Sequence, residues 1–203
     1  MVFRSNHPQK TGTKGQYPKY SQYKRVLMND FYNCCGYCND SHYHMGGWKG
    51  MQIDHFAPRT PFEDLEHDYD NLVYSCFYCN NAKSNDWVTN DSASPISDNG
   101  RRGYINPREE AYSDLFLRGA TGSIVPQNDI GLYIYTNLNL GLLRHELIYT
   151  IDRIILAVIL IDNTTAGNEL NQNVIEVLTD NKNKLLSEKF KLELEFRDII
   201  DAR

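Results

Sequence analysis

The chain has 203 residues, a formal net charge of -5 at pH 7 and a hydrophobic content of 41%. It is long enough to bury a core in one or two domains. The longest apolar run, residues 154–161, is too short to cross a bilayer, and no apolar segment near the start is typical of a signal peptide. We therefore expect a globular, cytoplasmic protein. The negative net charge argues against a protein that binds nucleic acid through overall charge alone.

The leader of the chain is basic, in contrast to the acidic chain as a whole. The first 25 residues carry basic and no acidic side chains, whereas residues 63–70 form an acidic loop. Proline and glycine interrupt residues 1–17, which are predicted to be irregular. Two interpretations of the basic leader stand: a solvated tail, or an arm that contacts a nucleic-acid backbone.

Hydrophobic periodicity predicts a compact unit in the first half of the chain. Apolar side chains at three- and four-residue steps predict a helix over residues 21–32. A glycine-marked turn precedes a strand at 51–56, and a second strand is expected at 72–74. A helix is expected from about residue 80. Together the last three elements predict a β-β-α unit.

The second half is predicted to be mostly helical. Residues 91–102 are rich in Ser, Asp, Asn and Gly and predict a loop or linker, followed by a hairpin around 119–125. An apolar stripe over 143–161 predicts a helix that ends at 163–167. A second helical region is expected over about 169–200.

Two Cys-x-x-Cys pairs flank the first predicted strand. The pairs are Cys35/Cys38 and Cys76/Cys79, and four such thiolates are the ligand set of a tetrahedral zinc site. Cysteines without a secretory signal favour metal over disulfides. Because four cysteine ligands leave no open coordination position, this zinc is expected to be structural. Cys34 is left over, and its spacing from Cys38 offers an alternative pairing.

Further polar residues exceed what a zinc knuckle needs. Asp54 and His55 end the first strand, and Asn80 directly follows the last cysteine. A histidine suits general-base catalysis because its pKa lies near working pH, and carboxylate and amide oxygens suit a hard cation such as Mg²⁺. Successive strand residues point to opposite faces, so Asp54 and His55 serve one site only if the strand ends or twists there. The set matches the needs of metal-assisted phosphodiester hydrolysis.

The chain resembles the HNH, or ββα-metal, endonucleases, in the branch stapled by a four-cysteine zinc site, over about residues 30–88. The motifs that carry the resemblance are Cys35-x-x-Cys38, Ile53-Asp54-His55, Asn71-Leu72 and Cys76-x-x-Cys79-Asn80-x-x-Lys83. In the final motif position the family has either His or Asn, and here it is Asn80. The resemblance implies an α+β fold with an HNH core, an N-terminal helix and a mostly helical C-terminal region.

The resemblance also implies residue roles. His55 would be the general base, and Asp54 and Asn80 would bind a catalytic Mg²⁺ (or Mn²⁺ or Ni²⁺). Asn71 would hold the loop and orient the histidine. Lys83 would contact the phosphate or the leaving side, with a solvated helix lysine as the alternative.

Three cations are candidates for contact with nucleic acid: Arg59, Lys24 and Arg25. An ordinary surface position is the alternative for Arg59. His42, His44 and His67 are expected to be ordinary loop residues, although His42-x-His44 offers another metal donor pair.

We divide the chain into a leader and first helix (1–34), an HNH core (35–90) and an accessory region (91–203). The accessory region loosely resembles that of bacterial HNH proteins, many of which act in anti-phage defence beside an ATPase. That likeness implies a protein partner, such as an ATPase, or self-association through the C-terminal helices. The alternative is a helical lid that completes the core.

Two functions are consistent with these residues. The primary hypothesis is a metal-dependent endonuclease that nicks or cuts DNA. The rival is a non-catalytic zinc module that binds nucleic acid or a protein. A binding module has no need of Asp54, His55 and Asn80 together, which favours the enzyme.

Overall fold

The computed structural model describes residues 1–89, 96–167 and 170–201. The chain forms two compact units, Met1–Leu142 and Leu143–Arg203, which are described separately. Helices combine with two small antiparallel sheets, so the predicted α+β class is confirmed. The boundary predicted between residues 90 and 91 lies outside the described residues, and the three-part division stays a prediction.

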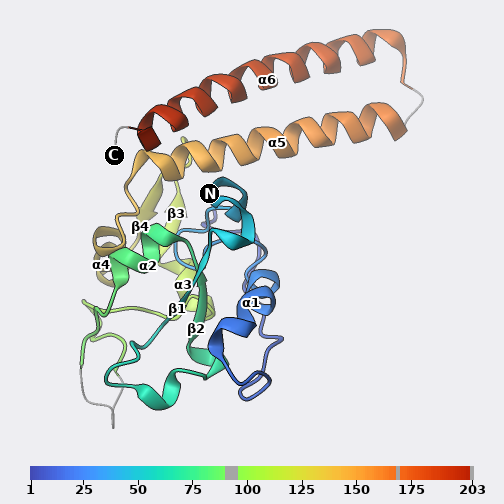
Figure 1. Cartoon of the computed structure of the whole chain (residues 1–203). Coiled ribbons are helices and arrows are strands. Elements are labelled where there is room, and N and C mark those ends of the chain that lie inside the picture. Colours follow the sequence, from blue (N-terminus) through green and yellow to red (C-terminus); the bar gives the residue numbers. More distant parts are fainter. Residues whose placement is uncertain (90–95, 168–169, 202–203) are drawn as a thin grey trace. The chain divides into compact units, whose positions relative to one another are not determined.

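A β-β-α unit forms the centre of the first compact unit (Figure 1). Strand β1 (Gln52–His55) pairs antiparallel with β2 (Leu72–Ser75), and helix α2 (Phe77–Lys83) packs against β1. Cys76 is the N-cap of α2, and its sulfur accepts from the backbone N–H of Cys79 at 3.4 Å. This cap starts the helix earlier than the sequence predicted.

Helix α1 (Lys24–Asp30) covers most of the helix predicted at 21–32 and packs against β2. Short 3-10 turns supply the connections of this region: η1 (Tyr20–Tyr23), η2 (His42–Met45), η3 (Gly47–Lys49), η4 (Glu63–Leu65) and η5 (Tyr69–Asn71). The turn η1 leads directly into α1, so the chain enters the helix beside the end of β1, where Tyr20 packs on His55.

The chain after residue 95 contributes to the same unit. Helix α3 (Glu110–Asp114) precedes the strands β3 (Phe116–Arg118) and β4 (Ile124–Pro126), which pair antiparallel and confirm the predicted hairpin. Helix α4 (Asp129–Asn137) comes next and was not predicted. The side chain of Asn128 starts it by accepting from the N–H of Gly131 at 2.8 Å.

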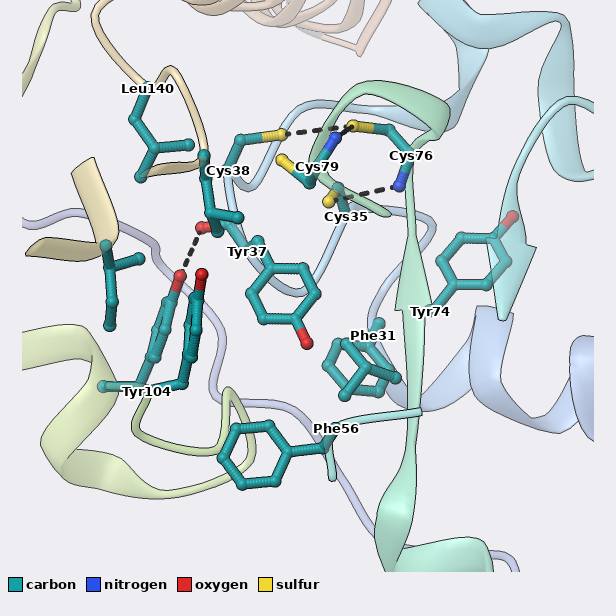
Figure 2. Packing of buried hydrophobic residues seen from close by; sticks show 14 of the residues in the cluster. Phe31, Cys35, Tyr37, Cys38, Phe56, Tyr74, Cys76, Cys79, Tyr104 and Leu140 are labelled. Atoms are coloured by element: carbon teal, nitrogen blue, oxygen red, sulfur yellow. Dashed lines mark hydrogen bonds between the residues drawn. The ribbon is translucent and has the colours of Figure 1, made fainter. Parts of the chain in front are cut away.

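The core of this unit is rich in tyrosine (Figure 2). Buried tyrosines need a partner for the hydroxyl group, and three of them show how that need is met. Tyr69 donates to Asp30 at 2.5 Å, Tyr104 to Asp86 at 2.9 Å, and Tyr112 to the carbonyl of Tyr37 at 2.9 Å. These bonds connect distant segments through the core, so the hydrophobic interior also fixes polar positions.

The basic leader is irregular, as predicted, but neither interpretation of it describes its packing. Phe3 is 2% exposed in the core, and the buried guanidinium of Arg4 donates to Ser113 and to the carbonyl of Pro107. Further along, Lys10 pairs with Asp70 of the acidic loop. The leader is therefore packed on the unit, and two of its lysines, Lys10 and Lys14, pair with the acidic loop.

The second unit is a pair of long helices, α5 (Leu143–Gly167) and α6 (Gln172–Asp201), which run side by side (Figure 1). An ion pair between Lys182 and Asp162 joins them. Helix α5 ends at Gly167, within the predicted range 163–167, although residues 163–166 are still helical. The hydroxyl of Thr164 donates to the carbonyl of Leu160 at 2.8 Å within the helix, and Thr165 does the same one residue later, so these polar side chains are satisfied without ending it.

Within the ranges described, no helix combines the length and apolar character needed to cross a membrane.

Candidate active site

Four cysteines meet at one end of the β-β-α unit. Cys35, Cys38, Cys76 and Cys79 are buried, and their sulfurs lie within 4.8 Å of one another. A tetrahedral zinc with Zn–S bonds of about 2.3 Å places sulfurs about 3.8 Å apart, and the Cys38 and Cys76 sulfurs are 3.9 Å apart. The donor set and spacing therefore fit a structural zinc ion.

The backbone around this cysteine cluster supports that fit. The N–H of Cys76 donates to the sulfur of Cys35 at 3.3 Å, an interaction that favours thiolate ligands. Gly36 lies so close to Phe31 and Val73 that an added Cβ would come within 2.7 Å of each. Cys34 lies outside the cluster and is not disulfide-bonded, so the alternative pairing of Cys34 with Cys38 is wrong.

A polar cleft of about 350 Å³ opens between the end of β1 and α2. Its lining residues come from η1, β1, the loop after β1, and α2 with the turn after it: Tyr20, Ile53, Asp54, His55, Pro58, Arg59, Asn80, Asn81, Ser84 and Asn85. The structure thus brings together Asp54, His55 and Asn80, which the sequence predicted to act at one site. The strand ends at His55, which satisfies the condition set by strand alternation.

His55 is held with one ring nitrogen inward. Its Nε2 lies 3.0 Å from the carbonyl oxygen of Glu66, and because a carbonyl only accepts, Nε2 carries the proton. In the neutral ring the lone pair then belongs to Nδ1. Tyr20 packs edge-on against the ring, 4.7 Å between centroids. Burial lowers the pKa of His55, with Arg59 and Lys83 adding to the effect, which favours the neutral form that a general base requires.

Asp54 lies at the floor of the cleft and is 5% exposed. Its Oδ2 accepts from the hydroxyl of Tyr37 at 2.5 Å and pairs with Nζ of Lys83 at 3.2 Å. Burial raises the pKa of Asp54, and Lys83 is the largest opposing influence. Burial also raises the pKa of Tyr37 well above its usual value, so the phenol is a hydrogen-bond donor. Because both bonds use Oδ2, Oδ1 is the oxygen left for a cation.

Asn71 fixes the loop that comes after β1. Its Oδ1 accepts from the N–H of Ala57 at 2.7 Å, and its Nδ2 donates to the carbonyls of Ala57 and Leu65 at 3.0 and 3.2 Å. The Leu65 carbonyl lies one residue before Glu66, whose own carbonyl binds His55. These contacts agree with the loop-holding role that the resemblance implied for Asn71.

Asn80 faces the cleft from the first turns of α2. Its Nδ2 donates to Oε1 of Gln52 at 2.5 Å, which leaves the amide oxygen as the donor atom for a cation. Gln52 and Asp54 are two residues apart on β1 and share one face of the strand. Gln52 thus orients one predicted metal ligand from the strand that carries the other.

The predicted cations are placed differently from one another. Lys83 is fully buried, and its Nζ donates to the carbonyl of His55 at 3.0 Å. It therefore contacts strand β1 and is not exposed to a ligand in the cleft. Arg59 lines the cleft and is paired loosely with Glu66 at 3.3 Å. Lys24 and Arg25 lie on α1 against the ring of Trp48, with Arg25 4.6 Å from its centroid.

Tyr20, Tyr37 and Gln52 contact His55, Asp54 and Asn80, respectively, and were not themselves predicted as site residues. Tyr37 had a local signal, since it lies within the first cysteine pair. Gln52 had a weaker one, its two-residue offset from Asp54. Tyr20 had none, because the contact with His55 joins segments that are distant in sequence.

Two antiparallel strands followed by a helix, with four clustered cysteines at one end, form a small ββα-like region. Residues 35–86 match the family model described as HNH endonuclease. No curated protein and no solved structure matches the chain significantly. The family is one of nucleases that bind divalent metals and act on DNA.

Proposed function

We propose that this protein is a metal-dependent endonuclease that hydrolyses phosphodiester bonds of DNA, by nicking one strand or cutting both, in the cleft between β1 and α2. The observation that supports it most is the joint position of His55, Asp54 and Asn80 in one polar cleft. Each offers the atom that the reaction needs: a ring nitrogen lone pair from His55 and an oxygen from each of the other two.

The chain's own residues would divide the reaction between them. Asp54 Oδ1 and the amide oxygen of Asn80 would hold a Mg²⁺, Mn²⁺ or Ni²⁺ ion, which supplies a Lewis acid for the scissile phosphate. His55 accepts a proton from the attacking water at Nδ1, while Nε2 stays bound to the Glu66 carbonyl. Asn71 keeps that carbonyl in place by holding the loop.

The cysteine cluster would hold a structural zinc ion and support the floor of the cleft. Arg59 lines the cleft wall, and its side chain is 59% exposed, so it is the nearest predicted cation for a flanking phosphate. Lys24 and Arg25 with Trp48 offer a second, more distant contact. A few such contacts would position DNA where a chain of negative net charge gains nothing from bulk attraction.

The wider role that we propose is an effector of anti-phage defence in the bacterial cytoplasm, acting with a protein partner such as an ATPase. The sequence resemblance of the accessory region supports it. The helix pair also exposes large apolar side chains, among them Leu156, Leu160, Val177 and Phe190, and exposed apolar groups of this kind are typical of protein contacts. Self-association through the same helices is the alternative.

The variant His55→Ala tests the proposed function. We expect plasmid nicking in Mg²⁺, Mn²⁺ or Ni²⁺ to fall by roughly 10²–10⁴, the usual weight of a general base, with zinc content unchanged. EDTA should abolish nicking by the parent protein. His44→Ala, whose ring does not line the cleft, is the matched control and should nick at the parent rate.

Two results would contradict the proposal. Cleavage by His55→Ala at the parent rate would show that His55 is not the general base. A parent protein that binds DNA with bound zinc, but cuts it in none of the three metals, would favour the non-catalytic zinc module.

A further inference from the structure

Tyr37 stands between two parts of the molecule that the proposed function treats separately. Its backbone lies inside the first cysteine pair, between Cys35 and Cys38. Its ring is fully buried, and Figure 2 shows the hydroxyl directed away from the four sulfurs. That hydroxyl donates to Oδ2 of Asp54 at 2.5 Å. One side chain therefore joins the cysteine cluster to the carboxylate at the floor of the cleft.

The backbone of Tyr37 has little freedom to move independently of the cluster. The hydroxyl of Tyr112 donates to the carbonyl of Tyr37 at 2.9 Å, and Arg118 donates to the carbonyl of Cys38 at 2.9 Å. The N–H of Gly36 donates to the carbonyl of Tyr74 at 2.7 Å. Since the knuckle is braced on both sides, the backbone of Tyr37 and the two cysteines that flank it are held as one rigid segment.

The orientation of the Asp54 carboxylate depends on a small number of hydrogen bonds. Its two hydrogen-bonded neighbours are Tyr37 and Lys83, and both bind Oδ2. Without Tyr37, the carboxylate of Asp54 would be tied to Lys83 alone and could rotate about that contact. Partners of this kind, which orient a ligand without touching the metal, govern metal affinity.

We propose that Tyr37 is a positioning residue that holds Asp54 for the divalent ion of the cleft, and that it thereby couples the cysteine cluster energetically to that ion. This inference rests on the proposed function, because it assumes that Asp54 binds a cation. Coupling between two binding sites is reciprocal. Zinc in the cluster therefore strengthens cation binding in the cleft, and a cation in the cleft strengthens zinc retention.

The first experiment measures Mn²⁺ binding by electron paramagnetic resonance to the zinc-loaded protein. Tyr37→Phe keeps the buried ring and removes the hydroxyl. We expect it to lower Mn²⁺ affinity roughly 10–100-fold, the usual cost of losing such a partner, with zinc content unchanged. Tyr74→Phe is the matched control: its ring is equally buried, its hydroxyl bonds His42 at 2.9 Å, and it should keep the parent affinity.

The second experiment uses the reciprocal effect and needs no Tyr37 variant. Zinc retained at equilibrium against a nitrogen-donor chelator, which prefers Zn²⁺ to Mg²⁺, is measured with and without Mg²⁺. We expect Mg²⁺ to raise zinc retention in the parent protein and to have no effect in Asp54→Asn. This comparison decides the matter if Tyr37→Phe fails to fold.

The outcomes separate the two proposals. If the parent nicks DNA and binds Mn²⁺ through Asp54, but Tyr37→Phe binds Mn²⁺ as tightly, the coupling is overturned and the endonuclease stands. If the parent nicks DNA but Mg²⁺ does not change its zinc retention, the coupling is likewise overturned and the endonuclease stands. A parent that neither binds Mn²⁺ at Asp54 nor nicks DNA overturns both.

Discussion

Two lysine–aspartate pairs in the first compact unit use the same chemistry in opposite settings. Lys83 and Asp54, under the cleft, have side chains that are 0% and 6% exposed, with 3.2 Å between Nζ and Oδ2. Lys10 and Asp70, between leader and acidic loop, are 56% and 58% exposed and only 2.6 Å apart. The shorter pair is the weaker one, because water screens it and competes for both groups. Burial, not distance, decides what each pair contributes.

The largest effect on the buried pair is expected from disrupting the cysteine cluster next to it. Cys76→Ser takes one ligand from the cluster that positions Tyr37 and, through it, Asp54. Structural zinc contributes on the order of 10–16 kcal/mol to folding in small zinc peptides, so we expect the residue 1–142 unit to lose its cooperative unfolding transition. Elemental analysis should find one zinc per chain in the parent and none in the variant.

Cys34→Ser is the control for that experiment, since Cys34 lies outside the cluster. The Cys34→Ser variant should retain zinc and have the same melting temperature as the parent protein. A disulfide between any two of the four clustered cysteines, or a Cys76→Ser protein that melts normally, would contradict the zinc assignment.

Removing the buried cation itself should have the next largest effect. Lys83→Met leaves the Asp54 carboxylate buried without its charged partner and removes the donor to the His55 carbonyl. Breaking a buried pair in this way costs about 3–5 kcal/mol. Urea denaturation followed by circular dichroism gives the change in unfolding free energy. A loss below about 1 kcal/mol would show that the site relaxes and that burial is not decisive here.

The exposed pair should give the smallest effect. Lys10→Met should lower the unfolding free energy by less than about 1 kcal/mol, and that small loss should shrink further at high salt. The same urea titration at low and high ionic strength measures both. A loss as large as that of Lys83→Met would mean that the leader is anchored by charge, and not by the packing of Phe3 and Arg4.

The sequence predicted those parts of the molecule that depend on local spacing. Two Cys-x-x-Cys pairs predicted the cluster, because two-residue spacing brings thiolates to one point wherever the chain turns. The order of strand, strand and helix between residues 51 and 83 could be inferred from periodicity and glycine. Asp54, His55 and Asn80 could be assigned to one site only on the condition that the strand ends or twists at His55, and their roles came from the family resemblance.

What the sequence could not predict depends on contacts between distant segments. Lys83 was expected to contact a phosphate or, as the alternative, to be solvated, and only the fold shows that it is buried against the main chain of β1 and Asp54. Tyr20 reaches His55 from a turn 35 positions earlier in the chain. The leader was interpreted from charge alone, yet the burial of Phe3 decides its path.

Helix ends were the other source of error. The polar segment at 163–167 predicts the end of a helix, and α5 does end there, but only at the last residue, Gly167. Threonine hydroxyls can bond to carbonyls of their own helix, as Thr164 and Thr165 do. Helix α4 was not predicted because it is short and comes directly after a hairpin. Both cases reflect side-chain bonding within a helix, or at its cap, that composition does not reveal.

The hydrogen bonds from Tyr112 and Arg118 to the knuckle have a consequence for modularity. The family match ends at residue 86, yet two carbonyls of the first cysteine knuckle are satisfied by residues beyond it. Phe3 packs at a tilt against Phe116, 5.1 Å between ring centroids, and so ties the start of the chain to the same region. An excised segment 35–86 would expose those carbonyls, so we do not expect this segment to fold as it does here without the rest of the unit. Transferring this segment to another protein would therefore require the whole of residues 1–142.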